Sequence, residues 1–508
     1  MNSYVPPRPR RVTNPFWRLL SSENTDGKRR TGRYNRPKVN FRSLVLLLGA
    51  IRLLGQVQAG AIDSIFADYN PKTSPGCAVG IVKSGQLFFE KGYGAANLEY
   101  GLPLSPQSVF QIASASKPFT ALSILILVQD GKLRLEDPIR RYLPEMPDYA
   151  NRVTIAQLIG HTSGLRDAMT LVVLSGRSFG ETFGKNDIMK LITRQTGLNF
   201  PPGDQWMYSN TDYILAGVIV ERVSRKTLRQ FADERIFGPL GMKNTHYYED
   251  PASEIVARRA TGYSPTTSSF TIDEGETYVL GAAGVHTTIE DLVRWDSALS
   301  APPPALAVAI AALQKPAILN NGSTAHAGTA DWTLGSLLAE PWGRYKTIRQ
   351  DGAWAGFRSD FLRIPEEGLS IICLCNRSDA DPTAMSRRMA RLFLPEMPTA
   401  SAKNPPLNEP GKVAIGTAPK LLNGSYYSPD LETIYHIKPI ARGLALKCGR
   451  LDEEVNSVPG GSGFTNTWLT IEPTSNGFVV NTDRVRGLRF RRVAHPCVDI
   501  SSSAAAPN

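Results

Sequence analysis

The chain has 508 residues, of which 42% are hydrophobic and 20% charged, as is typical of a globular protein with a large core and more than one domain. Its net charge of +11 comes almost entirely from residues 1–60, which hold 12 Lys and Arg against 2 Asp and Glu. The rest of the chain is close to neutral and has no basic stripe, so we exclude nucleic acid as a partner.

Residues 1–60 are predicted to be a disordered basic leader with a signal segment. The apolar run Ser43–Leu54, followed by a V-x-A site that ends at Ala59, resembles a secretory signal. It predicts an extracytoplasmic protein, periplasmic or secreted, with the membrane or cell wall nearby. The long basic region and Arg52 inside the apolar run argue against a signal. They leave a cytosolic extension, a membrane anchor or a true start near Val39 as alternatives.

Residues 61–394 are predicted to form one domain with an antiparallel sheet flanked by helices, an α/β (α+β) fold. Apolar runs bounded by turn residues predict a hairpin near each end of this domain, and local connections favour antiparallel pairing. The middle of the domain is expected to be mainly helical, and the four predicted strands are Cys77–Lys83, Leu87–Lys91, Gly356–Ile364 and Leu369–Leu374.

The chain is organised around the stretch Ser108–Leu133, which predicts a helix that is apolar on all sides and therefore buried. Pro118 falls in its first turn, where proline is tolerated, and Gly131 supplies the residue that ends it. Ser114 then lies at the N-terminal end of the helix, with Lys117 one turn later on the same side.

This S-x-x-K pattern predicts a nucleophilic serine that is activated by a lysine. Backbone N–H groups and the positive helix end around Ser114 favour developing negative charge. An amine held away from water, as expected for Lys117, loses proton affinity and can act as a base.

A second element, Tyr208-x-Asn210, lies in a loop that leads into a helix predicted over Asp212–Val223. A tyrosine near a lysine ammonium is expected to lose its proton more readily and to shuttle it. Asn210 is expected to hold the lysine or a substrate amide. The alternative is that Tyr208 merely packs and Asn210 merely caps the helix.

Other motifs are rejected on spacing. Gly180–Lys185 is one residue short of a phosphate loop, and His161 with Ser163 does not form the G-x-S-x-G elbow. No spacing of His, Cys and acidic residues suits zinc. We therefore predict no metal and no organic cofactor.

The five cysteines cannot all pair within one chain. Cys373 and Cys375 are expected to be buried thiols on one face of a strand. A bridge between Cys448 and Cys497 is left open, because the compartment is expected to be oxidising.

The C-terminal part is predicted to be a Pro-rich linker over 395–419, a small antiparallel β-barrel or sandwich over 420–497 and a loose tail over 498–508. Six short alternating segments predict the strands of this domain, namely Gly424–Ser428, Thr433–Lys438, Leu444–Lys447, Trp468–Ile471, Phe478–Asn481 and Gly487–Arg492.

Taken together, these elements resemble the serine β-lactamase and penicillin-binding-protein superfamily, near its branch of class C β-lactamases, D-aminopeptidases and related esterases. The likeness runs from about Ala61 to Asn376. The motifs that carry it are SASKPFT at Ser114–Thr120, LIGHTSGL at Leu158–Leu165, PPGDQWMYSNTDY at Pro201–Tyr213, FGPLGMKNT at Phe237–Thr245, GAAGVHTTIEDLVRW at Gly281–Trp295 and DGAWAGFRSDFLRIP at Asp351–Pro365.

The resemblance implies a β-lactamase/transpeptidase-like fold and a role for each matching residue. Ser114 would be the acylated nucleophile, Lys117 its proton acceptor, Tyr208 the partner base and Asn210 a positioning residue. The backbone N–H groups of Ser114 and Ala353 would form the oxyanion hole. The substrate-binding strand beside the site would be Gln350-Asp351-Gly352.

The sequence departs from its relatives at Gln350, where true β-lactamases have Lys and the esterase and peptidase branches often have His. Strand alternation predicts that Gln350 and Gly352 face the cleft while Arg349 and Asp351 face away. A neutral amide lacks the charge-assisted bond that a cation offers a carboxylate, a difference of about 1 kcal/mol.

We therefore predict a hydrolase of a small ester, amide or peptide, with D-amino-acid peptides as one candidate class. The alternatives are a non-catalytic penicillin-binding-like recognition or sensor protein on the same scaffold, a true class C-type β-lactamase, and a transpeptidase. The hydrolase prediction requires the Ser114 hydroxyl, the Lys117 amine and the Tyr208 phenol to converge in one pocket.

Overall fold

The computed structural model describes residues 58–70, 72–249, 253–275, 278–396, 422–458 and 463–493. The predicted signal segment, nearly all of the Pro-rich linker and the tail lie outside these ranges, so the predicted domain boundaries there stay predictions. Among the helices in the described ranges, none has both the length and the apolar character that a membrane span requires.

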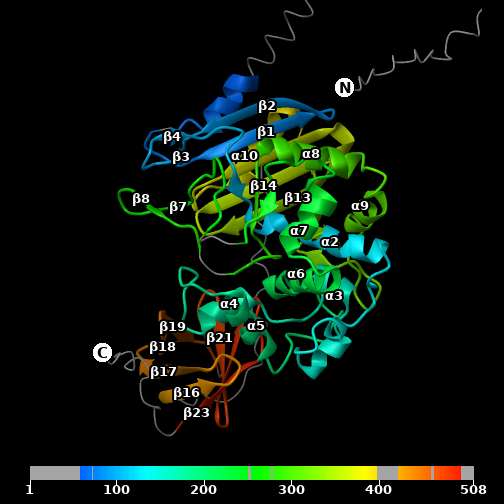
Figure 1. Cartoon of the computed structure of the whole chain (residues 1–508). Coiled ribbons are helices and arrows are strands. Elements are labelled where there is room, and N and C mark those ends of the chain that lie inside the picture. Colours follow the sequence, from blue (N-terminus) through cyan, green and yellow to red (C-terminus); the bar gives the residue numbers. More distant parts are fainter. Residues whose placement is uncertain are drawn as a thin grey trace, which may run out of the picture. The chain divides into compact units, whose positions relative to one another are not determined.

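The centre of the N-terminal domain is an eight-stranded antiparallel sheet (Figure 1). Both predicted hairpins are confirmed and lie side by side in it, because β1 pairs with β15. From one edge to the other the strands are β10 (His326–Ala327), β11 (Ala330–Trp332), β12 (Leu338–Trp342), β13 (Tyr345–Trp354), β14 (Phe357–Ile364), β15 (Leu369–Cys375), β1 (Cys77–Lys83) and β2 (Gln86–Tyr93).

Helices cover both faces of this sheet, and for that reason β1 and β15 are buried almost throughout. On one face, α10 (Pro382–Phe393) and the helical residues 58–65 bury Ile62 and Met389 against the strands. On the other face lies α8 (Ile289–Ser300). A Cβ on Gly80 of β1 would come within 2.4 Å of Ile289, so this close contact requires glycine.

The predicted central helix is α2 (Lys117–Gln129), and residues 117–127 of it are all buried. It ends where predicted, with Gly131 in the left-handed conformation at φ +69°. Phe119 packs on Trp295 of α8 at 4.8 Å between ring centroids. Around it stand α3 (Ile155–Ile159), α4 (Ala168–Leu174), α5 (Lys185–Thr193), α6 (Asn210–Ser224), α7 (Leu228–Ala232) and α9 (Ala307–Leu313).

Short elements complete the domain. The strands are β3 (Ala95–Asn97), β4 (Leu102–Pro103), β5 (Phe110–Gln111), β6 (His246–Tyr247), β7 (Tyr263–Pro265), β8 (Phe270–Ile272) and β9 (Val285–Thr287). The single helical turns are η2 (Ala113–Ser116), η3 (Ile139–Arg141), η4 (Asp148–Arg152), η5 (Asp233–Phe237) and η6 (Pro365–Glu367).

The C-terminal domain is a closed eight-stranded antiparallel barrel, coloured orange to red in Figure 1. Tyr435, Phe478 and Phe490 stack in its interior, with Phe478 and Phe490 4.7 Å apart. All six predicted strands are present among β16 (Gly424–Ser428), β17 (Thr433–Ile440), β18 (Gly443–Cys448), β19 (Leu451–Ser457), β20 (Phe464–Thr465), β21 (Leu469–Thr474), β22 (Gly477–Thr482) and β23 (Leu488–Arg492). The sequence did not indicate β19, which is mostly polar, or β20, which has two residues.

The barrel is bonded to the N-terminal domain through buried polar groups. The Arg166 guanidinium forms an ion pair with Asp430 at 2.7 Å, and both side chains are almost fully buried. The Gln195 amide donates to the Asp430 carbonyl at 2.9 Å, and the Tyr435 hydroxyl donates to the Leu174 carbonyl at 2.7 Å. A buried pair of this kind fixes the register of the two domains, because either charge alone would be costly to bury.

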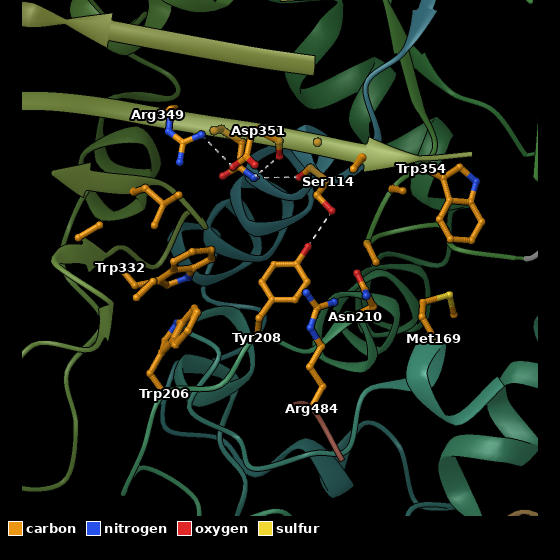
Figure 2. Close-up of a pocket in the computed structure, with 18 of the residues that line it drawn as sticks. Ser114, Met169, Trp206, Tyr208, Asn210, Trp332, Arg349, Asp351, Trp354 and Arg484 are labelled. Carbon is orange, nitrogen blue, oxygen red and sulfur yellow. Dashed lines mark hydrogen bonds and ion pairs between the residues drawn. The ribbon is translucent and has the colours of Figure 1, made fainter. Parts of the chain in front are cut away.

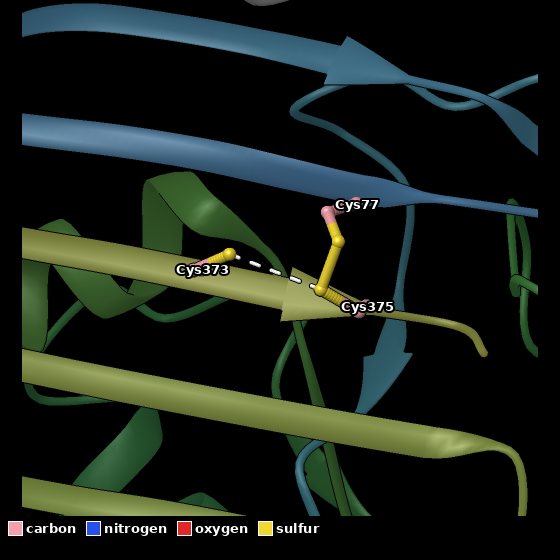
Figure 3. A group of neighbouring side chains, drawn as sticks. All are labelled: Cys77, Cys373 and Cys375. Carbon is pink, nitrogen blue, oxygen red and sulfur yellow. Dashed lines mark hydrogen bonds between the residues drawn. A yellow bond between two sulfur atoms is a disulfide. The ribbon is translucent and has the colours of Figure 1, made fainter. Parts of the chain in front are cut away.

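The cysteine prediction is wrong for Cys375, which forms a disulfide with Cys77 (Figure 3). The two residues are 298 positions apart, but β1 and β15 are antiparallel neighbours and their register sets Cys77 opposite Cys375. Cys373 is the buried thiol that was predicted, 3.8 Å from the Cys375 sulfur. These three are the one group of potential metal ligands found in the described ranges, and the disulfide occupies two of its sulfurs. Cys448 is a buried free thiol, and Cys497 lies outside the described residues.

Candidate active site

Ser114 lies in the tight turn η2, directly before the first residue of α2. Ala113 has φ +50°, a left-handed conformation that is unfavourable for a residue with a side chain. The Ser116 hydroxyl accepts a hydrogen bond from the Val285 backbone at 3.0 Å, which ties the turn to β9. The turn therefore holds Ser114 at the head of the buried helix, as the sequence predicts.

Lys117 is fully buried, and its amine has three polar neighbours. The Nζ atom lies 2.7 Å from the Ala282 carbonyl, 3.0 Å from Asn210 Oδ1 and 3.1 Å from Ser114 Oγ. Burial lowers the pKa of this amine from 10.5 to about 7.

A neutral Lys117 amine has two N–H donors and one lone pair, and these match its three polar neighbours. The carbonyl and Oδ1 oxygens can only accept, so they take both N–H bonds of a neutral Lys117. The lone pair of the amine then faces Ser114 Oγ, where it can receive the hydroxyl proton. This is the arrangement that a general base requires.

The Tyr208 hydroxyl is hydrogen-bonded to Ser114 Oγ at 2.7 Å (Figure 2). Its ring packs on His161 at 4.7 Å, and the Lys117 amine lies 4.8 Å from the ring centroid. The expectation of an easily ionised phenol is wrong, because burial raises the pKa of Tyr208. Tyr208 is a neutral phenol, so it can donate to one oxygen while accepting from another.

Asn210 is the first residue of α6, and its side chain is held by Asp167. The Asn210 amide donates to Asp167 Oδ2 at 2.9 Å, which turns Oδ1 toward Lys117. Asp167 is itself buried and caps α4 by accepting from the Met169 backbone at 2.8 Å. Asp167 was not among the predicted site residues, although an aspartate before the apolar run AMTLVVL is a helix-cap signal.

The LIGHTSGL segment fixes the position of the loop that carries Tyr208. His161 Nδ1 and Ser163 Oγ contact the two oxygens of Asp212, at 2.8 and 2.5 Å. Burial raises the pKa of Asp212 well above its usual range and lowers the pKa of His161 well below its usual range. The Met207 backbone donates to the His161 carbonyl at 2.9 Å, so this cluster fixes the backbone that carries Tyr208.

Strand β13 closes the site from the side of the sheet. A Cβ on Gly352 would come within 2.2 Å of the Ile112 carbonyl, so β13 lies directly against the Ser114 turn. The Gln350 amide donates to the carbonyls of Ser114 at 3.2 Å and Asp351 at 3.1 Å. Ser114 and Ala353 line the same cavity, as their predicted role in an oxyanion hole requires.

The prediction that Arg349 and Asp351 face away from the cleft is wrong, because both line the cavity. Their side chains do alternate away from Ser114, and Arg349 donates to Thr383 of α10. However, pairing between β12 and β13 ends at Arg349. The part of β13 after Arg349 therefore has an unpaired edge, which is open to the cavity. Arg349 is buried beside Asp360, whereas half of the Asp351 side chain is exposed.

The cavity around Ser114 has a volume of about 350 Å³, within the range of small-molecule sites. Trp206 and Trp332 form one wall, and Met169 and Trp354 lie on the other side (Figure 2). Arg484, from the loop between β22 and β23 of the barrel, lies next to Tyr208. No sequence signal indicated Arg484, because its proximity to Ser114 arises only from the docking of the barrel.

A sequence model described as Beta-lactamase matches residues 62–395. A penicillin-binding protein of Bacillus subtilis strain 168 is 30% identical over 330 residues, which cover 63% of this chain and 72% of that protein. A D-aminopeptidase of Cereibacter sphaeroides is 26% identical over 420 residues, which cover 80% of this chain and 76% of that protein.

Among solved structures, the octameric penicillin-binding protein homologue from Pyrococcus abyssi superposes with a TM-score of 0.58 at 20% identity. The superposition covers 86% of this chain and 99% of that chain. The fold is therefore shared over most of this chain. From the family match and the fold together, the chain belongs to the Beta-lactamase family.

Proposed function

We propose that the protein is a serine acyl hydrolase that cleaves an ester or an amide through an acyl-enzyme on Ser114. One observation carries the proposal: Ser114 Oγ lies between the Lys117 amine at 3.1 Å and the Tyr208 hydroxyl at 2.7 Å. A hydroxyl between a neutral amine and a phenol can lose its proton to one side while the other side relays a proton.

In the proposed acylation step, Ser114 Oγ attacks the substrate carbonyl and its proton moves to the Lys117 lone pair. The pKa of about 7 for Lys117 supports this role, because the amine is then unprotonated in a large share of molecules at neutral pH. Asn210 and the Ala282 carbonyl hold the amine in position throughout.

The negative charge that develops on the substrate oxygen is assigned to the Ser114 and Ala353 backbone N–H groups. Support comes from the position of Ser114 before α2 and from the short distance between β13 and the Ser114 turn. Preorganised donors of this kind are usually the largest single contribution to acyl-transfer rates.

Tyr208 is proposed to hand its proton to the leaving atom as the bond to the carbonyl carbon breaks, and to be reprotonated from Lys117. Water then attacks the acyl-enzyme, with the same two groups accepting its proton. The water proton passes through these groups to Ser114 Oγ as the acyl bond breaks, so each turnover takes one proton from water and gives one to the leaving group.

We infer that amides and peptides, including those of D-amino acids, are candidate substrates beside esters. The inference is supported by the match to a protein named D-aminopeptidase over 80% of this chain. A class C-type β-lactamase is the less favoured assignment, because Gln350 stands at the strand position where true β-lactamases have Lys.

The test is turnover of a 4-nitrophenyl ester by the wild type and by Ser114→Ala. We expect many turnovers per wild-type molecule and a loss of about 10³-fold or more in the variant. A single release of nitrophenol without turnover would favour a penicillin-binding recognition protein instead. Acyl transfer to an added amine in preference to water would favour transpeptidation.

We also propose that the protein works outside the cytoplasm. The Cys77–Cys375 disulfide supports this location, because disulfides persist in oxidising compartments. Fractionation of cells that express the full chain tests it. Recovery of the protein with the cytoplasmic fraction, with free thiols at both positions, would contradict it.

A further inference from the structure

Arg484 brings a positive charge from the barrel into the active-site cavity. Its guanidinium stacks on Tyr208, 4.8 Å from the ring centroid, and its side chain lines the cavity together with Ser114 (Figure 2). About 30% of the side chain is exposed, so a bound ligand can reach it.

The backbone of the loop that carries Arg484 is held by several bonds to the N-terminal domain. The Asn199 amide donates to the Arg484 carbonyl at 2.9 Å and accepts from the Arg486 backbone at 2.7 Å. Arg166 donates to the Gly487 carbonyl at 2.9 Å. The backbone from which the Arg484 side chain enters the cavity is therefore fixed by contacts with the N-terminal domain.

The guanidinium has little to neutralise it. Within the described part of the chain, its one ion pair is a 3.4 Å contact with the adjacent Asp483, and its Nε has no hydrogen-bond partner although it is shielded from solvent. Arg349, the other cavity arginine, is surrounded by Asp351 and Asp360. A guanidinium whose Nε donor is shielded from solvent and has no hydrogen-bond partner is suited to bind an anion.

We propose that Arg484 binds a carboxylate on the leaving group of the substrate and is thereby a specificity-determining residue. The inference rests on the proposed function, in which Tyr208 protonates the leaving atom. Because Arg484 stacks on the same ring, a carboxylate a few bonds from that atom lies within reach of its planar donor fork. An anion placed beside Asp351 would instead be repelled by the half-exposed carboxylate of that residue.

This assignment explains how a cleft with Gln350 at the position of the usual cation still carries positive charge. The barrel supplies the charge, on the side of the cavity where Tyr208 lies. The predicted preference is therefore for anionic leaving groups such as amino acids, peptides with a free carboxyl end or hydroxy acids, with an acyl part that bears no anion.

The test compares 4-nitrophenyl acetate with 3-carboxy-4-nitrophenyl acetate, each kcat/KM divided by the rate of alkaline hydrolysis. In the wild type we expect the ratio to favour the carboxylated ester about tenfold. Arg484→Gln should bring the ratio near one, and Arg484→Glu should invert it. The ratio cancels any change in Ser114 reactivity that both esters share.

Arg486→Gln is the matched control, because it removes the same charge from the same loop. The Arg486 side chain bonds to Gln205 at 3.1 Å and does not line the cavity. The wild-type ratio should persist in this variant. A wild-type ratio of one, an unchanged ratio in Arg484→Gln, or a preference for mono-4-nitrophenyl succinate, which carries its anion on the acyl part, would overturn the proposal.

Binding of the product 5-hydroxy-2-nitrobenzoate, followed by tryptophan fluorescence, gives the same comparison without turnover. We expect its Kd to rise about tenfold in Arg484→Gln and to stay unchanged in Arg486→Gln. Equal Kd values in all three proteins would refute the anion site even if esters are hydrolysed. Loss of affinity in Arg484→Gln in a protein that hydrolyses no ester would refute the proposed hydrolase and retain the anion site.

Discussion

The acylation centre and the binding rim of the cavity are built in different ways. At the centre, Ser114, Lys117, Tyr208 and Asn210 are joined by hydrogen bonds of 2.7 to 3.1 Å. The rim consists of charged and aromatic side chains that reach the cavity from the open edge of β13, from β11, from the loop before α6 and from the barrel, namely Trp206, Trp332, Arg349, Asp351 and Arg484.

Because the two parts are built differently, the chemistry of the site and its substrate specificity are separable in this fold. The centre is carried by two short motifs at the starts of α2 and α6, so it persists wherever those helices pack together. The rim depends on where the sheet pairing stops and on how the barrel docks. A substitution at the centre should therefore affect all substrates alike, whereas one at the rim should change the choice among them.

Replacement of Lys117 by Met should have the largest effect. The substitution removes the amine but keeps a side chain of similar length in the buried site, so kcat/KM for any ester should fall about 10³-fold. Steady-state kinetics with neutral and carboxylated esters measure this loss. An equal loss for both is expected, and a loss confined to one of them would contradict the separation of centre and rim.

Breaking the buried ion pair of the barrel should have the next largest effect. Arg166→Met leaves the Asp430 carboxylate buried without a cation, so the free energy of unfolding should fall by about 3 kcal/mol. Urea denaturation followed by tryptophan fluorescence measures the change. The carboxylated-ester preference should fall together with stability, since Arg166 also holds the Arg484 loop.

Arg222→Met is the matched control for that variant. Arg222 pairs with Glu145 where both side chains are substantially exposed, so its loss should cost at most about 1 kcal/mol. Similar losses in the two variants would mean that burial of the Arg166 pair is unimportant.

The pH dependence of the reaction tests the centre alone. With a pKa of about 7 for Lys117, more of the amine is protonated as the pH falls, and a protonated amine cannot accept the serine proton. kcat/KM should therefore fall below pH 7, by about tenfold for each further unit, and level off above pH 8. Tyr208→Phe should keep this acid limb at a lower rate. A flat profile from pH 5.5 to 8 would rule out Lys117 as the base.

Gln350→Met should have the smallest effect. It leaves the Ser114 carbonyl without the donor at 3.2 Å, which should cost about 1 kcal/mol of stability and a few-fold in kcat/KM. Thermal unfolding and ester kinetics measure both. A loss as large as that of Lys117→Met would show that Gln350 takes part in the chemistry and does not merely support the turn.

Much of the fold could be predicted because its elements carry local signals. Residues 117–127 belong to a largely apolar stretch, and the helix that they form ends just before Gly131. Each predicted hairpin consists of two apolar runs separated by turn residues. The strands at the far edge of the sheet, β10 to β12, could not be found in this way. They are short, and β12 contains Pro341, so no periodicity marks them.

The centre of the site could be predicted for the same reason, since each of its motifs spans only three or four residues. The Cys77–Cys375 disulfide, the approach of Arg484 and the exposure of Asp351 to the cavity depend on contacts between distant segments. On β13, Gln350 and Gly352 line the cavity as predicted, but Arg349 and Asp351 line it as well. The end of the pairing between β13 and β12, which opens the edge, has no signal in the sequence.

Covalent labelling with a fluorophosphonate probe, followed by peptide mapping by mass spectrometry, identifies the nucleophile itself. We predict a single labelled residue, Ser114, with no label in Ser114→Ala and a rate of labelling that falls below pH 7. Label on another residue, or label retained in folded Ser114→Ala, would contradict the assignment of Ser114 as the nucleophile.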